Sequence, residues 1–173
     1  MTPELEQRLF KKYPELFARR CLPMSETCMC WGLSCGDGWY AILERLCSTI
    51  TWFCTKTNTP VPQFEQVKEK FGTLRVYLRT GTSYVIDCLV RDAERESAYT
   101  CETCGEDGEL NKKGWLRCSC PTHTPPLVKE ENERFQTYRS FFYKTPWWYS
   151  RFLLLGTRLT YKFIRLIRKI RRK

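Results

Sequence analysis

The chain has 173 residues, of which 42% are hydrophobic and 14% aromatic, so its composition excludes a disordered polar chain and favours one folded domain with a modest core. It contains no apolar run of the roughly 18 residues that a membrane-spanning helix needs, and its acidic start lacks the apolar core of a signal peptide. We therefore expect the eleven cysteines to be thiols and metal ligands of a cytosolic protein rather than a disulfide framework.

Two helices are predicted in the first third of the chain. Thr2 and Pro3 favour a helix start, because threonine can cap a helix and proline suits its first turn. Residues 21–40 contain three glycines, which predict an ordered loop. Apolar residues then recur at helical spacing and predict a helix from about Gly38 to Phe53, with Asp37 as its cap.

A β-hairpin is predicted next. Apolar and polar residues alternate over residues 74–79, which is the period of a strand, and Phe71-Gly72 suits the turn before it. Cations and an aromatic residue on one strand face can bind phosphate and stack on bases, although a merely solvated face is the alternative. The residues concerned are Lys68, Lys70, Arg75, Tyr77 and Arg79.

Two short pairs of metal-ligand type follow a third predicted helix, which Thr82 or Ser83 can cap. The pairs are Cys101-x2-Cys104, with Gly105 behind it, and Cys120-x2-His123. A tetrahedral zinc ion needs four such ligands from two short corners, so the spacing predicts a structural Zn²⁺ site without an open position for water.

The sequence also allows other states of these four residues. A disulfide or free thiols are the alternatives to zinc, and Cys118 competes with Cys120 for the third position. A second metal site is less well supported, because its four cysteines lack paired corners; these are Cys21, Cys28, Cys30 and Cys35.

An enzyme is the less favoured class. A cysteine nucleophile needs a base, and His123, the chain's only histidine, is already a predicted zinc ligand. A metal-dependent hydrolase would need a carboxylate cluster, which nothing in the spacing demands; the candidates are Glu26, Asp37, Glu65 and Glu69.

The positive charge is concentrated at the C-terminal end. Residues 135–173 contain 11 Lys and Arg and no Asp or Glu, whereas residues 1–134 contain 18 Lys and Arg and 19 Asp and Glu. Apolar residues at helical spacing from Phe152 to Ile170 predict a cationic amphipathic helix. We expect an anionic surface to contact its basic face, through Arg151, Arg158, Lys162, Arg165, Arg168, Lys169 and Arg172. A packed terminal helix whose charge only aids solubility is the alternative.

Several motifs in order resemble a family of small uncharacterised zinc-knuckle proteins of bacteriophages and prophages. They are Cys35-Gly-Asp-Gly-Trp39 with the residues before it from Glu26, Gln66–Arg75 with its Val-Lys-Glu-Lys-Phe-Gly run, Gly114–Arg117, and the two ligand pairs. The resemblance spans roughly residues 5–123. It implies a phage or mobile-element setting, a location in the cytoplasm of a bacterial host, and a metal knuckle in which the position of Cys118 is typically not a cysteine.

These observations predict an α+β fold: an α+β body over residues 1–98 with helices around a short antiparallel hairpin, a zinc knuckle or ribbon over 99–123, and a helical extension over 124–173. The expected function is that of a non-enzymatic phage-type accessory protein. Its expected partner is nucleic acid, or a host complex bound to nucleic acid, and no small-molecule substrate is expected. Attachment to an anionic membrane surface is the first alternative, and a metal-dependent hydrolase is the second.

Overall fold

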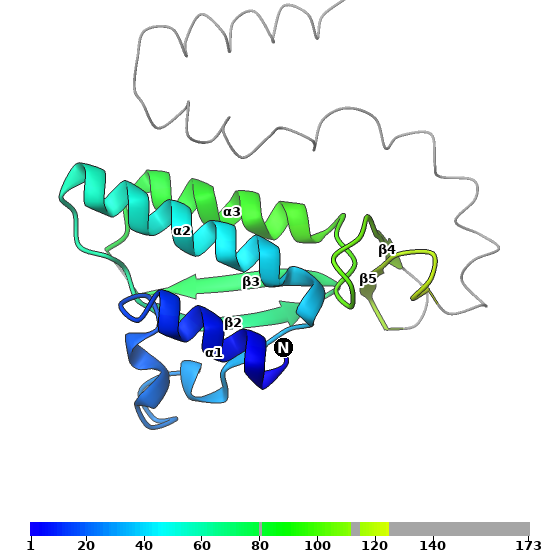
Figure 1. The fold of residues 1–173 in the computed structure, drawn as a ribbon, viewed down its shortest axis with the longest axis horizontal. Helices are drawn as coiled ribbons and strands as arrows, with labels where there is room; N and C mark the ends of the chain where they lie inside the picture. Colours follow the sequence, from blue (N-terminus) through cyan, green and yellow to red (C-terminus); the bar gives the residue numbers. More distant parts are fainter. Residues whose placement is uncertain (80, 112–114, 125–173) are drawn as a thin grey trace, which may run out of the picture. The chain divides into compact units, whose positions relative to one another are not determined.

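The computed structural model describes residues 1–79, 81–111 and 115–124, which form an α+β fold, as the sequence predicts (Figure 1). All of these residues belong to one compact unit. The elements are α1 (Pro3–Lys12), β1 (Leu33–Ser34), α2 (Tyr40–Thr57), β2 (Phe64–Lys70), β3 (Thr73–Leu78), α3 (Tyr84–Ser97), β4 (Glu109–Asn111) and β5 (Arg117–Ser119), with 3₁₀ turns at Ala18–Cys21, Met29–Trp31 and Asp37–Trp39.

The main sheet has three strands. β2 pairs with β3 in the predicted antiparallel hairpin, and both residues of its turn, Phe71 and Gly72, have positive φ values of 55° and 77°. β1 adds a short parallel strand beside β2 that the sequence does not predict, since two residues in a glycine-rich loop show no periodicity. β4 and β5 form a separate two-stranded ribbon.

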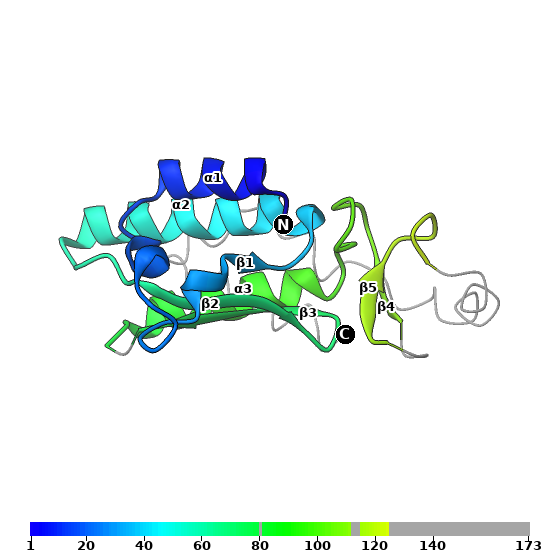
Figure 2. The same cartoon turned by 90° about the horizontal axis from the view of Figure 1, so that it is seen from below.

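The helices cover one face and one edge of the main sheet. α1 and α2 lie over the same face of the β2–β3 hairpin, and α3 runs beside β3 (Figures 1 and 2). Val67, Leu74 and Val76 point into the buried core between these layers. α3 also satisfies the outer edge of β3, because Leu74 N–H donates to Ser97 Oγ at 2.8 Å and Val76 N–H donates to Glu94 Oε1 at 3.0 Å.

The helix ends differ in part from the prediction. Asp37 does not cap α2; its carboxylate instead accepts the Thr2 N–H at 2.6 Å and holds the start of α1, where the Thr2 side chain makes no capping bond. α2 runs one turn further than expected, to Thr57, and ends at Asn58 in the left-handed conformation. Ser83 caps α3 as expected, with its hydroxyl accepting a backbone N–H at 3.4 Å.

The predicted C-terminal extension falls on residues 125–173, outside the described part of the chain. Among the helices that the structure describes, none combines the length and the apolar character needed to cross a membrane.

Candidate metal centre

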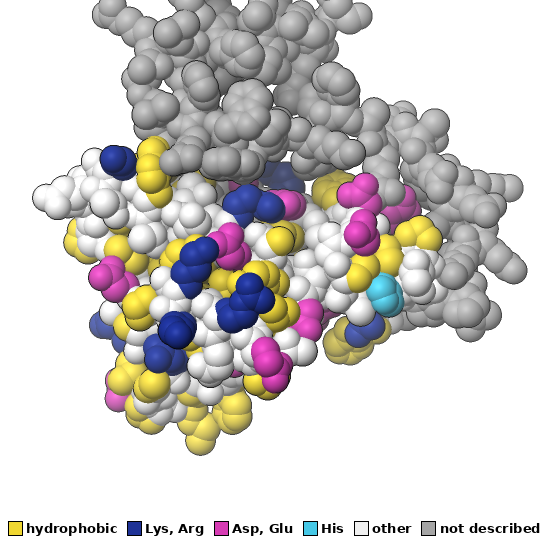
Figure 3. Space-filling view, viewed as in Figure 1, with side chains coloured by type: hydrophobic (Ala, Val, Ile, Leu, Met, Phe, Trp, Pro, Cys, Tyr) yellow, Lys and Arg dark blue, Asp and Glu magenta, His cyan; other side chains and the backbone are white. Residues whose placement is uncertain are grey.

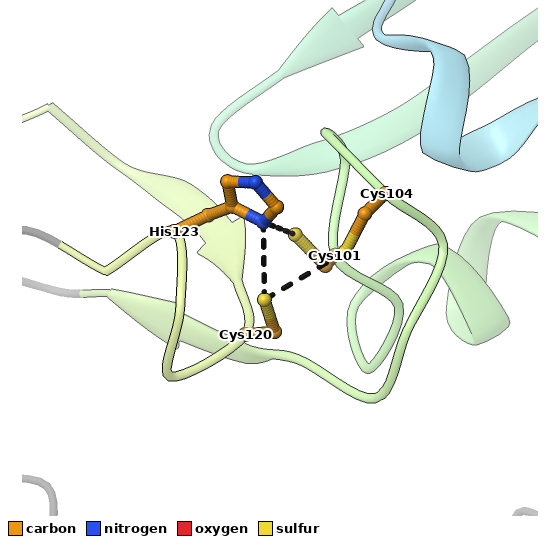
Figure 4. Close-up of side chains that lie close together, drawn as sticks. All are labelled: Cys101, Cys104, Cys120 and His123. Atoms are coloured by element: carbon orange, nitrogen blue, oxygen red, sulfur yellow. Dashed lines mark hydrogen bonds between the residues drawn. The ribbon is translucent and has the colours of Figure 1, made fainter.

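The two predicted ligand pairs converge in the segment after α3. Cys101 and Cys104 lie in the turns that follow the helix, Cys120 comes directly after β5, and His123 lies in the next turn. Figure 4 shows the four side chains pointing toward one another. Their ligand atoms all lie within 4.8 Å of one another, so this group can hold a metal ion.

The distances between ligand atoms suit a tetrahedral ion. His123 Nδ1 lies 3.1 Å from Cys120 Sγ and 3.7 Å from Cys101 Sγ, and Cys104 Sγ lies 3.7 Å from Cys120 Sγ. A regular tetrahedron with metal–sulfur bonds of about 2.3 Å places two sulfur atoms ~3.8 Å apart. The four ligands can therefore close on an ion with small movements only.

The backbone of the first pair is wrapped tightly enough to present both sulfur atoms on one side. Gly105 has a φ of 82°, and its N–H donates to the Cys101 carbonyl at 2.9 Å. The second pair is closed in a similar way, since His123 N–H donates to the Cys120 carbonyl at 3.0 Å. A side chain other than hydrogen at position 105 would be strained at this φ, which explains the glycine.

The electrostatics of the site favour the thiolate form of two cysteines. Desolvation raises the pKa of Cys101, but hydrogen bonds from the backbone of Cys120, Cys104 and Thr103 outweigh it, and the net effect lowers the pKa. At Cys120, desolvation is again outweighed, by hydrogen bonds from the backbone and ring of His123, which lower the pKa to about 6. Thiolate is the form of cysteine that binds metal, so hydrogen bonding within the site prepares these two ligands for binding.

The knuckle is joined to the body by the turn before α2. Gly38 N–H donates to the Glu102 carbonyl at 2.9 Å, and Gly36 N–H donates to Glu102 Oε1 at 3.0 Å. The indole N–H of Trp39, a fully buried side chain, donates to the Thr100 carbonyl at 2.9 Å. This turn, Gly36–Trp39, positions the first ligand pair, a role that the sequence does not reveal although the Gly-Asp-Gly-Trp motif is conspicuous there.

Cys118, the reserve ligand from the sequence, lies outside the metal group. Its side chain is fully buried in the core cluster, and its carbonyl accepts the Glu102 N–H at 3.1 Å. It thus belongs to the packing between the ribbon and the first ligand pair.

The second set of cysteines is not brought together. Over residues 1–79, 81–111 and 115–124, the group in the knuckle is the only one placed to hold a metal ion. Burial raises the pKa of Cys35 to about 12, which keeps it a neutral packed thiol, whereas Cys21 and Cys28 are exposed. Cys30 is half-buried, so Cys35 is the only buried thiol of these four.

The four carboxylates considered for a divalent ion do not form one group among the described residues, although Glu26 and Glu65 line the same cavity. Asp37 accepts from Thr2, Glu65 forms a salt bridge with Arg19 at 3.1 Å, and Glu69 accepts the Gly72 N–H. The separate bonds of these carboxylates give no support to a hydrolase site there.

The predicted basic contact residues all fall outside the described residues; they are Arg151, Arg158, Lys162, Arg165, Arg168, Lys169 and Arg172. Comparison of the chain with protein-family models, with curated proteins and with solved structures finds no match. The functional inference therefore rests on the site and on the distribution of charge.

Proposed function

We propose that this is a non-enzymatic accessory protein of the phage type, in which a structural Zn²⁺ holds the knuckle and the basic C-terminal segment binds nucleic acid or a host complex bound to nucleic acid. The observation that carries the proposal is the convergence of Cys101, Cys104, Cys120 and His123 within 4.8 Å. Such a group stabilises a fold when it is metal-loaded, and it leaves other surfaces to bind partners.

The donor set supports zinc as the metal. Three sulfur atoms and one imidazole nitrogen are soft or borderline ligands, which suit zinc and disfavour magnesium or calcium. Hard cations take oxygen ligands, and no carboxylate belongs to this group. The near-tetrahedral spacing of the four atoms supports the same choice.

The same residues support a structural role for the metal. Four protein ligands complete a tetrahedral shell, so no position is left for a reacting water. His123 is the only histidine of the chain and is used as a ligand, so no second imidazole can act as a general base.

The distribution of charge supports an anionic partner. Residues 135–173 contain 11 Lys and Arg and no Asp or Glu. Nucleic-acid phosphates are bound by such clusters with a strong dependence on salt. An anionic membrane surface is the competing partner, because the same segment combines cations with an apolar stripe.

Binding of labelled DNA by the full-length protein, measured by anisotropy over a salt series, tests this proposal. We expect Arg165→Gln/Lys169→Gln to reduce the salt slope by about 0.9 for each lost phosphate contact. A matched control, Lys11→Gln/Lys56→Gln, removes the same charge from exposed positions on α1 and α2 and should leave the slope unchanged.

Two outcomes would contradict the proposal. Equal DNA binding by the C-terminal variant and the control would show that this segment does not contact nucleic acid. Flotation of the protein with phosphatidylglycerol vesicles, without measurable DNA binding, would establish the membrane-surface alternative instead.

A further inference from the structure

The outward face of the β2–β3 hairpin combines cations and aromatic rings without a carboxylate. In the register of the hairpin, Val67 pairs with Val76, and both side chains are buried, so the alternate positions point away from the core. The outward pairs are Gln66 with Tyr77, Lys68 with Arg75, and Lys70 with Thr73. Successive pairs are about 6.8 Å apart along the strands.

The cations of this face are not paired with carboxylates of the described residues. Within the described part of the chain, Lys68, Lys70 and Arg75 form no salt bridge. Arg75 Nη1 instead donates to Thr73 Oγ1 at 2.6 Å and to the Leu74 carbonyl at 2.7 Å, both neutral acceptors. Residues 1–79, 81–111 and 115–124 therefore leave the positive charge of this face uncompensated.

The helical side of the molecule differs in this respect. Figure 3 shows cations interspersed with carboxylates over α1 and α2. Two cations of these helices form salt bridges, Lys12 with Glu44 and Arg45 with Glu96. The hairpin face thus differs in clustering three cations on one strip of two paired strands, an arrangement complementary to an anion.

Two aromatic rings mark the ends of the cationic strip. Lys68 Nζ lies 5.5 Å from the ring centroid of Tyr77, and Lys70 Nζ lies 5.3 Å from that of Phe71. The rings are exposed by 43% and 64%, so both can be reached from solvent. Exposed rings beside cations are the arrangement on which bases stack while phosphates are neutralised.

Phe71 is also an unusual residue for its position. Its φ of 55° lies in the left-handed region, where a bulky side chain is strained and where asparagine or glycine is preferred. Burial offsets little of this strain, since most of the residue is exposed. Strain of this kind points to a use for the ring outside the fold.

A cavity of about 310 Å³ opens at the other end of the strip. Its lining includes the Tyr77 side chain, Gln66, Glu65 and the loop Met24–Cys28, which contains Glu26. Its volume is at the lower limit of small-molecule sites. Because its two carboxylates repel phosphate but can accept hydrogen bonds from amino groups, the cavity suits a base rather than a phosphate.

We propose that this face binds single-stranded nucleic acid, with phosphates along Lys68, Arg75 and Lys70, one base stacked on Phe71 and another held against Tyr77 at the cavity. Bases must be unpaired to reach either ring, so duplex is excluded from these contacts. The ligand class is that of the proposed function, but no C-terminal residue takes part, so either proposal can fail alone.

The test uses full-length zinc-loaded protein and a fluorescent single strand that contains adenine, cytosine and thymine, with the matching duplex as a second probe. Lys68→Gln/Arg75→Gln should weaken single-strand binding and reduce the salt slope by about 1.4, because each phosphate contact contributes about 0.7. Tyr77→Leu should weaken single-strand binding about tenfold and leave duplex binding unchanged. Zinc content and circular dichroism establish that each variant is folded.

The controls separate this surface from the C-terminal segment. Lys11→Gln/Lys56→Gln removes equal charge from the helical side and should bind like the wild type. If Lys68→Gln/Arg75→Gln binds as that control does, the hairpin proposal is overturned, and a loss confined to Arg165→Gln/Lys169→Gln leaves the proposed function standing. Photocrosslinks from bromouracil should map to peptides containing Phe71 or Tyr77; crosslinks confined to residues 135–173 would also overturn the proposal.

Discussion

Gly38 connects the body to the knuckle where their backbones approach closely. A Cβ at this position would lie less than 3 Å from the Cys101 carbonyl oxygen and from the backbone nitrogens of Cys104 and Gly105. None of these atoms can rotate away. We expect Gly38→Ala to lower the free energy of unfolding by about 1–3 kcal/mol and to weaken zinc binding, measured by thermal denaturation and chelator competition.

A matched variant isolates the effect on the metal. Gly81 has a positive φ of 96°, and nothing lies within 4 Å of a Cβ built there. Gly81→Ala should therefore cost only local backbone strain and leave zinc affinity unchanged. Wild-type zinc affinity in Gly38→Ala would contradict the close packing of the two segments.

Glu44 makes the contact between α1 and α2 sensitive to acid. Its carboxylate accepts hydrogen bonds from Lys12 Nζ and from the Tyr13 hydroxyl, and the Lys12 bond is the largest cause that lowers its pKa below 4.5. A carboxylate with a lowered folded-state pKa adds stability above its ordinary pKa, and this stability is lost as the pH falls through the folded value.

Glu44→Gln should therefore be about 0.5–1 kcal/mol less stable than the wild type at neutral pH, a modest value because the pair is partly exposed. The difference should shrink as the pH is lowered below 4.5, the ordinary pKa of the group. Urea unfolding of both proteins over a pH series measures it. A difference that is constant with pH would show that packing, not charge, accounts for the contact.

At the scale of elements, the hairpin turn contains two residues whose substitution should change the stability of the protein in opposite directions. Phe71 is strained and exposed, so Phe71→Asn should raise the free energy of unfolding by about 1 kcal/mol. Gly72→Ala should lower it, because a Cβ there would overlap the Leu110 side chain and approach the Arg117 backbone. Thermal denaturation of the two variants measures both effects. A Phe71→Asn variant that is less stable than the wild type would show that the Phe71 backbone is not strained.

The elements that were predicted correctly are those with long or strongly periodic patterns. β3 alternates buried and outward residues, and α3 begins at a capping serine, so both are encoded locally. β1 was missed, because its two residues form a strand only by pairing with β2. The role expected of Asp37 was wrong for a related reason, since its partner is Thr2 rather than a residue of α2.

At the scale of the whole molecule, one part of the candidate site is encoded locally and another part depends on contacts between distant residues. The spacing of Cys101-x2-Cys104 and Cys120-x2-His123 predicts the ligands, because each corner is local. The position of the knuckle on the body depends on the hydrogen bond from the Trp39 indole to the Thr100 carbonyl. These residues are 61 positions apart, so the spacing of the ligands cannot predict the contact. The cationic face of the hairpin can be identified only when the strand register and the salt bridges of the described residues are known.

Metal removal should loosen this connection without unfolding the core. The amides of Gly36 and Gly38 donate to Glu102, which lies between two ligands, whereas Val67 lies in the buried sheet. Chelation should accelerate hydrogen exchange at both glycines and leave Val67 protected. An equal increase in exchange at all three amides would instead show that the whole fold depends on the metal. No increase at any of them would show that the knuckle holds its position without the metal.

The metal content of freshly purified full-length protein tests the central claim most directly. Native mass spectrometry with elemental analysis should find one zinc ion per chain, and Cys120→Ser should lose it while Cys118→Ser keeps it. A chain without zinc, or one in which Cys101 and Cys104 form a disulfide, would contradict the account.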